Sequence, residues 1–171
     1  VLGRHAKAIA LLNKLFAQGR IGKSYWAVVE GGPEGEDGLI DLPLGRKDPT
    51  RGWWMTHRPD GLPSRTRWRV LGRGTKAGLS LAWLELTPET GRTHQLRVHC
   101  EASGFPILGD PIYGSGRRHG PPELHLHARS LSLPLLPDKP ALTVEAPPPP
   151  HMLAALAACG WRALAPGSEG G

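Results

Sequence analysis

Hydrophobic positions recur at helical spacing in two segments, one near each end of the chain. The pattern over residues 6–18 predicts an amphipathic helix that Gly19 ends, because three large apolar side chains fall on one stripe: Ile9, Leu12 and Phe16. A run of Ala and Leu over residues 151–158 predicts a second, shorter helix that Gly160 ends. Few other segments have this period, so helices are expected to be a minor part of the fold.

Most of the remaining pattern is typical of β-strands. Alternation or continuous apolar character predicts strands at residues 23–30, 65–71, 79–86 and 124–133, with a short one at 39–44. The segment 79–86 is apolar on both faces and is expected in the middle of a sheet. Because short loops join the strands, we expect one α+β domain with a largely antiparallel central sheet and a few flanking helices.

The positive charge of the chain is concentrated in residues 46–76. This segment holds nine Lys and Arg against two Asp, whereas the whole chain has a formal net charge of +6. Three tryptophans are interleaved with the cations: Trp53, Trp54 and Trp68. Basic and aromatic side chains together suit a polyanion with stacking bases, which predicts RNA or DNA as the partner. The alternative is a solvated, solubilising face with the tryptophans in the core.

Within this segment, the strand at 65–71 places its cations on one face. Arg65, Arg67 and Arg69 alternate there with Thr66, Trp68 and Val70. We expect the three arginines to bind RNA.

The length and cysteine content limit the class of protein. We expect one domain over residues 1–165 and a disordered tail over 166–171. No apolar run is long enough to span a membrane, and nothing resembles a signal peptide. The two cysteines, Cys100 and Cys159, form no disulfide framework, so a reducing, cytoplasmic setting is expected. We also expect a monomer.

The densest group of reactive side chains lies in residues 86–114, LTPETGRTHQLRVHCEASGFPILGDPIYG. Thr93 is a suitable N-cap and Gly104 a suitable residue after the C-cap, which predicts a helix over 94–103. Its N-terminus would face the loop 90–92 and form an anion site. His94 and Arg97 would share a helical face. The alternative is a capped surface helix whose arginine makes an ordinary ion pair.

Other candidate groups in the chain give weaker signals. The His125-x-His127 pair, with His94 and His99, invites a metal hypothesis, but no carboxylate or cysteine completes a recognised spacing, so we predict no metal. Asp110 lies in a Gly-Asp-Pro turn, where its side chain is expected to bond nearby backbone.

Several stretches stand in the order that one known family has them. They are GKSYWAVVEG, LIDLPLGR, GRTHQLRVH, GFPILGDPIYG, LHLHARSLSLP and VEAPPPPHM. On these motifs the chain resembles the RluA-type pseudouridine synthases over nearly its whole length. The resemblance implies isomerisation of uridine to pseudouridine in RNA (rRNA or tRNA), without cofactor or metal. It also implies a mixed, largely antiparallel sheet with a central cleft.

The resemblance also assigns roles to single residues. Tyr25 matches the family's active-site tyrosine, and Arg97 matches an arginine that pairs with the catalytic aspartate. The RNA side is implied to include Lys23, Arg92, His94 and Gln95, with the last three lining the RNA or supporting the loop.

The family's nucleophile is an aspartate in an HRLD-type motif, just ahead of the segment that matches VLGRHAKA at residues 1–8. None of the six Asp residues here stands in such a context. We therefore expect a catalytic domain that lacks its N-terminal part, starts within a strand, and forms no pseudouridine by itself. Two alternatives are a non-catalytic RNA-binding protein of the same fold and a small metallohydrolase with a histidine site.

Overall fold

The computed structural model describes residues 5–48, 50, 53–118, 120–136 and 138–163. Within them the chain forms three helices and eight strands, which confirms the α+β class. In chain order they are α1 (Ala6–Ala17), β1 (Gly22–Glu30), β2 (Asp37–Asp41), β3 (Leu44–Arg46), β4 (Met55–His57), β5 (Arg65–Lys76), β6 (Leu79–Pro88), α2 (Gln95–Ala102), β7 (Leu126–Leu133), β8 (Leu142–Glu145) and α3 (Pro150–Ala158).

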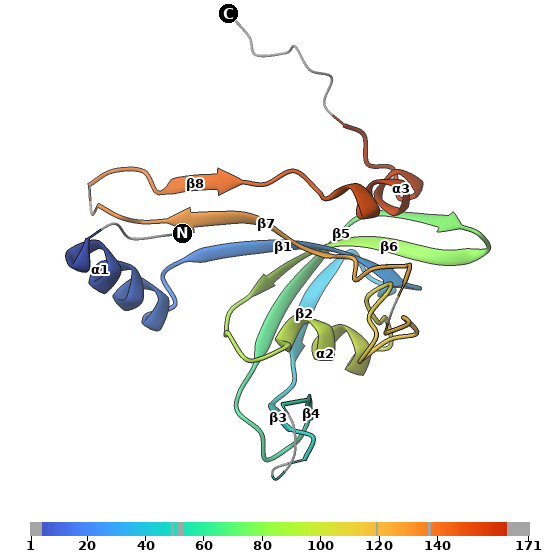
Figure 1. Ribbon diagram of the computed structural model, residues 1–171, viewed down its shortest axis with the longest axis horizontal. Coiled ribbons are helices and arrows are strands. Elements are labelled where there is room, and N and C mark those ends of the chain that lie inside the picture. Colours follow the sequence, from blue (N-terminus) through green and yellow to red (C-terminus); the bar gives the residue numbers. More distant parts are fainter. Residues whose placement is uncertain (1–4, 49, 51–52, 119, 137, 164–171) are drawn as a thin grey trace, which may run out of the picture.

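Six of the strands form one sheet in the order β2-β5-β6-β1-β7-β8, and each neighbouring pair is antiparallel. The apolar strand β6 lies in the middle beside β1, as its sequence predicts. The other two strands, β3 and β4, pair with each other and project from the end of β2 and β5 (Figure 1). We call residues 44–57 the β3–β4 hairpin.

The boundaries differ from the sequence-based expectation in three places. The predicted strand 39–44 is divided between β2 and β3, because Pro43 interrupts the ladder. The strand predicted at 65–71 continues to Lys76 and turns tightly into β6 through Ala77 and Gly78, both with positive φ. The strand predicted from residue 124 begins at Leu126. The expected strand around residue 1 and the expected tail at 166–171 lie outside the described residues.

The two faces of the sheet carry different helices. Alternation along β1 directs Ala27 and Val29 toward the layer that contains α2, and it directs Val28 toward α3. Cys100 of α2 lies in the first core and Cys159, just after α3, in the second, and both are buried free thiols. In Figure 1 the two helices lie on either side of the central strands, and α1 lies apart near the far ends of β1 and β7.

The end of α3 approaches the backbone of β5 very closely. A Cβ atom at Gly74 would lie 1.8 Å from the carbonyl oxygen of Ala158, and one at Gly72 would lie 1.9 Å from that of Cys159. Only glycine allows this approach, so these two positions fix how α3 covers the sheet. Within the described residues, no helix has the length and apolar character needed to cross a membrane.

Candidate active site

A pocket of about 240 Å³ opens where β1, the end of β6 and the start of α2 meet. Six of the nine predicted site residues line it: Lys23, Tyr25, Arg92, His94, Gln95 and Arg97. A larger cavity of about 510 Å³, lined by Leu79 and His125 among others, contains none of the nine. The smaller pocket is therefore where segments far apart in the sequence assemble the predicted chemistry.

Tyr25 is held rigidly in the middle of the sheet, on strand β1. It pairs with Leu86 of β6 on one side and with Ala128 of β7 on the other. A register shift between Ser24 and Tyr25 interrupts the pairing with β7 at this position. Because the residue is held between two strands, its phenol is presented to the pocket at a fixed place.

Arg97 forms an ion pair with Asp110 across the wall of the pocket. Its Nε donates to Oδ2 at 2.8 Å and its Nη2 donates to Oδ1 at 2.7 Å. Asp110 is fully buried, and the Arg97 side chain is 13% exposed. The resemblance assigned Arg97 to a catalytic aspartate, and nothing in the spacing of the two residues indicated that Asp110 would bind it.

Asp110 also holds the turn that it begins, which confirms the expectation for the Gly-Asp-Pro segment. Its Oδ1 accepts the backbone N–H groups of Ile112 and Tyr113 at 2.9 and 3.0 Å. Burial acts to raise the pKa of Asp110, but the hydrogen bonds from Arg97 and from these two amides outweigh it. The pKa therefore lies below the ordinary value, and the carboxylate stays ionised beside Arg97.

The start of α2 differs from the prediction. The N-cap is His94, not Thr93, and its backbone is left-handed with φ of 54°. Such a conformation is uncommon for a residue with a side chain and is found at functional sites. His94 Nε2 lies 3.5 Å from Arg97 Nη1, so the two share a face as expected. Burial and then the charge of Arg97 lower the pKa of His94, which favours the neutral ring.

Gln95 supports the loop 90–92 from inside the protein. Its Oε1 accepts the Thr90 hydroxyl at 2.7 Å and the Arg92 amide at 3.0 Å. Its amide nitrogen donates to Arg65 O and to Thr66 Oγ1 at 2.9 and 3.0 Å. Because the Arg92 N–H donates to Gln95 Oε1, it is not available to an anion at the site that we expected here.

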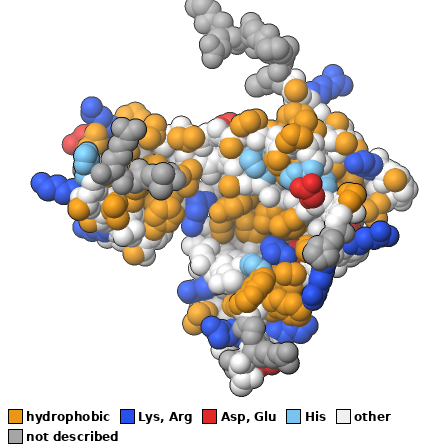
Figure 2. Space-filling model, in the orientation of Figure 1, with side chains coloured by type: hydrophobic (Ala, Val, Ile, Leu, Met, Phe, Trp, Pro, Cys, Tyr) orange, Lys and Arg blue, Asp and Glu red, His pale blue; other side chains and the backbone are white. Residues whose placement is uncertain are grey.

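The β3–β4 hairpin brings aromatic side chains to the same site. Trp53, which is 53% exposed, lies edge-on to the ring of His94 with 4.7 Å between centroids. Trp54 is 39% exposed, and the guanidinium of Arg118 lies 5.8 Å from its ring centroid. Figure 2 shows hydrophobic side chains flanked by Lys and Arg on the lobe that the hairpin forms. In the sequence, the tryptophans interleaved with cations in residues 46–76 indicated such an aromatic and basic surface.

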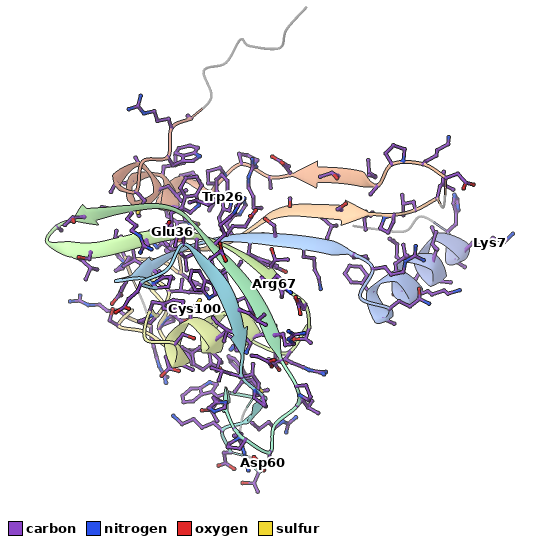
Figure 3. The ribbon with its side chains drawn as sticks, turned by 180° about the vertical axis from the view of Figure 1, so that it is seen from behind. Lys7, Trp26, Glu36, Asp60, Arg67 and Cys100 are labelled. Atoms are coloured by element: carbon purple, nitrogen blue, oxygen red, sulfur yellow. The ribbon has the colours of Figure 1, made fainter. Side chains whose placement is uncertain are left out.

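Arg65, Arg67 and Arg69 lie apart from the pocket. Thr66 and Trp68, which alternate with them, face the layer of α2, so the arginines lie on the opposite face of the sheet. Arg67 is labelled on β5 in Figure 3. They pair with carboxylates there: Arg65 with Asp41 and Glu89 at 3.2 Å, Arg67 with Glu89 at 2.6 Å, and Arg69 with Glu85 at 2.9 Å. Contact of these arginines with RNA stays a prediction.

The histidines in the metal hypothesis contact backbone or hydroxyl groups, although the buried Nε2 of His125 has no hydrogen-bond partner among the described residues. His127 Nε2 lies 3.1 Å from Ala146 O, and His125 Nδ1 lies 2.7 Å from Glu123 O. His99 is fully buried between Thr66 Oγ1 at 2.9 Å and Leu42 O at 3.1 Å. In the part of the chain that the structure describes, no three His, Cys, Asp or Glu side chains are grouped so that they could hold a metal ion.

The fold corresponds to that of RNA pseudouridylate synthase domains. The sequence profile of the RNA pseudouridylate synthase family matches residues 1–102. Human RNA pseudouridylate synthase domain containing 1 superposes with a TM-score of 0.75 and 35% identity, over 91% of this chain and 65% of that one. The chain belongs to the RNA pseudouridylate synthase family.

Its relatives include the RluA type that the motifs indicated. An uncharacterised RNA pseudouridine synthase of Zymomonas mobilis is 43% identical over 87% of this chain and 67% of that protein. The dual-specificity RNA pseudouridine synthase RluA of Vibrio vulnificus is 40% identical over 77% of this chain and 54% of that protein. The chain thus spans about half to two thirds of the length of these relatives.

Proposed function

We propose that the protein to which this chain belongs isomerises uridine to pseudouridine in rRNA or tRNA, acting in the cytoplasm as a monomer. The observation that carries the proposal is the joint position of Tyr25 and Arg97 on one pocket. The phenol can stack on or polarise the uracil ring, and the guanidinium provides positive charge that can orient a carboxylate. No cofactor is needed, since the reaction exchanges one bond to the ribose for another.

The target uridine has to leave the base stack to reach such a pocket. In the reaction, the bond between N1 and C1′ breaks, the uracil rotates, and a bond between C5 and C1′ forms. C5 loses its proton and N1 gains one. A catalytic carboxylate either attacks the ribosyl unit or assists its deprotonation. Asp110 is unsuited to this role because its carboxylate is fully buried and already accepts four hydrogen bonds.

The RNA strand would dock on the pocket side of the β3–β4 hairpin. Exposed Trp53 and Trp54 offer faces on which unpaired bases stack. Arg46 and Lys47 lie on the same hairpin, and neither has an ion pair among the described residues, so their charge is available to phosphate. By contrast, the arginines on the opposite face of the sheet already have carboxylate partners.

We further propose that residues 1–171 by themselves form no pseudouridine, because none of the described residues that line the pocket with Tyr25 and Arg97 has a carboxylate. The competing function is RNA binding without catalysis. It would be favoured if the complete protein also lacked an aspartate in an HRLD-type context. The sequence encoded immediately upstream of Val1 therefore distinguishes the two functions.

The test compares three proteins on uridine-rich cellular RNA with pseudouridine mapping as the readout. The complete protein should form pseudouridine, the 1–171 chain should not, and Tyr25→Phe in the complete protein should bind RNA but turn over more slowly. Turnover by the 1–171 chain would refute the proposed dependence on another segment. An inactive complete protein that still binds RNA would favour the non-catalytic function.

A further inference from the structure

Tyr113 contacts Arg97 and the two side chains within hydrogen-bond distance of its guanidinium, Asp110 and His94. It lies three residues after Asp110 and donates its backbone N–H to that carboxylate at 3.0 Å. The guanidinium carbon of Arg97 lies 5.1 Å from the centroid of its ring, within the range of a cation–π contact. Its ring also lies edge-on to that of His94, with 5.6 Å between centroids. The position and orientation of Arg97 therefore depend on where this ring lies.

The hydroxyl group of Tyr113 joins the site to the β3–β4 hairpin. The backbone N–H of Met55, the first residue of β4, donates to Tyr113 Oη at 3.0 Å. Arg97 has only donors, so the 3.5 Å contact with His94 Nε2 requires that nitrogen to accept. The proton of the neutral His94 ring is then on Nδ1, which donates to Tyr113 Oη at 3.1 Å.

One phenol oxygen thus accepts a hydrogen bond from the hairpin and another from the residue that contacts Arg97. Removing that oxygen leaves two donors without their acceptor, one on each side. The edge contact of Trp53 with His94 is a second link between the hairpin and the start of α2, and it does not involve this oxygen. Neither Tyr113 nor Met55 lines the pocket itself, so their effect on the reaction would be exerted through His94 and Arg97.

We propose that Tyr113 is a positioning residue, whose hydroxyl couples the seating of the β3–β4 hairpin to the orientation of Arg97. When RNA engages Trp53 and Trp54, the hairpin, His94 and Arg97 move as one unit because this oxygen links them. This inference rests on the proposed function, since it assigns a consequence for turnover to a link that is visible without RNA.

The test is Tyr113→Phe in the complete protein, with two readouts. The first needs no RNA: hydrogen exchange of the Met55 amide should become at least about tenfold faster, because the amide loses its acceptor. The second is catalytic: kcat should fall about tenfold or more while the Kd for RNA changes less than about threefold, since a misoriented group slows the reaction more than it weakens binding. The matched control is Thr143→Val, which removes one hydroxyl from the β7–β8 hairpin and should change neither.

The two readouts separate the possible failures. Unchanged exchange at Met55 would overturn the link itself. Faster exchange with an unchanged kcat would overturn the positioning role and leave a purely structural hydrogen bond. If the unsubstituted protein has no synthase activity on any RNA, the proposed function fails, and exchange at Met55 still decides whether Tyr113 holds the hairpin. A melting temperature measured for each variant shows that the fold is retained.

Discussion

The carboxylate of Asp110 lies wholly buried against the guanidinium of Arg97, joined to it by two hydrogen bonds of 2.7 and 2.8 Å. The pair links the first turn of α2 to the turn at residues 110–113, so it holds together two parts of the candidate active site. Such a pair stabilises little compared with apolar packing, but breaking one half leaves an uncompensated buried charge.

Asp110→Asn should therefore lower the free energy of unfolding by about 3 kcal/mol or more, because Arg97 stays charged without its partner and two backbone amides lose an anionic acceptor. Urea unfolding of the 1–171 chain measures this. The matched control is Asp60→Asn, which breaks the exposed pair with Arg58 and should cause no measurable change. Equal effects of the two substitutions would contradict the special position of Asp110.

RNA affinity should depend more on the hairpin than on the opposite face of the sheet. Arg46→Gln with Lys47→Gln should weaken binding and lower the magnitude of the salt slope by about 0.7 to 0.9 for each lost phosphate contact. Arg67→Gln with Arg69→Gln removes the same charge from the opposite face, where both side chains have carboxylate partners. Filter binding over a salt series compares them, and a larger loss in the second pair would place the RNA on the arginine face.

The stability of the fold should decrease as the pH falls below neutrality. Burial lowers the pKa of His99, His94 and His125 in the folded chain. Unfolded histidine titrates near pH 6.5. Below that pH the unfolded chain therefore binds more protons than the folded chain does. The stabilisation is fully present above pH 6.5 and is lost as the pH falls, at up to about 1.4 kcal/mol per pH unit for each such histidine.

Unfolding by urea at pH 7.5, 6.5 and 5.5 measures this slope. His99→Gln should make the slope shallower by up to the contribution of one proton. His99 is fully buried in the folded chain, and after the substitution the unfolded chain has no imidazole at this position to take up a proton. A slope that is as steep in the variant as in the parent would show that other groups cause the loss.

The packing of α3 should tolerate no side chain at Gly74. Gly74→Ala would place a Cβ 1.8 Å from Ala158 O, so the helix end has to move, at a cost of about 1 to 3 kcal/mol. Gly35→Ala is the control, since its Cβ would meet ordinary contacts of 3.6 Å. Thermal unfolding compares the two, and similar melting temperatures would mean that α3 adjusts freely.

The elements that the sequence predicted are those with long regular patterns. The strands β1 and β6 match their predicted spans closely, because each buries one or both faces against the core. The helix α1 also matches its span, but Leu15 is its buried residue, and Ile9 and Phe16 of the predicted stripe are each 47% exposed. The hairpin β3–β4 has strands of three residues, too short for alternation to be visible. Pro43 adds a break at its start.

Within the site, sequence reasoning found residues but not partners. Arg97 and Asp110 are 13 positions apart, and only the fold of the segment between them makes them neighbours. The alternation at residues 65–71 correctly placed three arginines on one face. It could not show that Glu85 and Glu89 lie beside them, because that depends on the pairing register of β5 with β6.

The two buried cysteines lie in separate cores, on opposite faces of the sheet. Burial raises the pKa of both thiols, so neither forms the thiolate that reacts with alkylating reagents while its layer is closed. The labelling rate of each thiol therefore reports the opening of one layer. Cys100 is labelled when α2 separates from the sheet, and Cys159 is labelled when α3 separates from it. Comparing the two labelling rates by mass spectrometry would give the order in which the molecule comes apart.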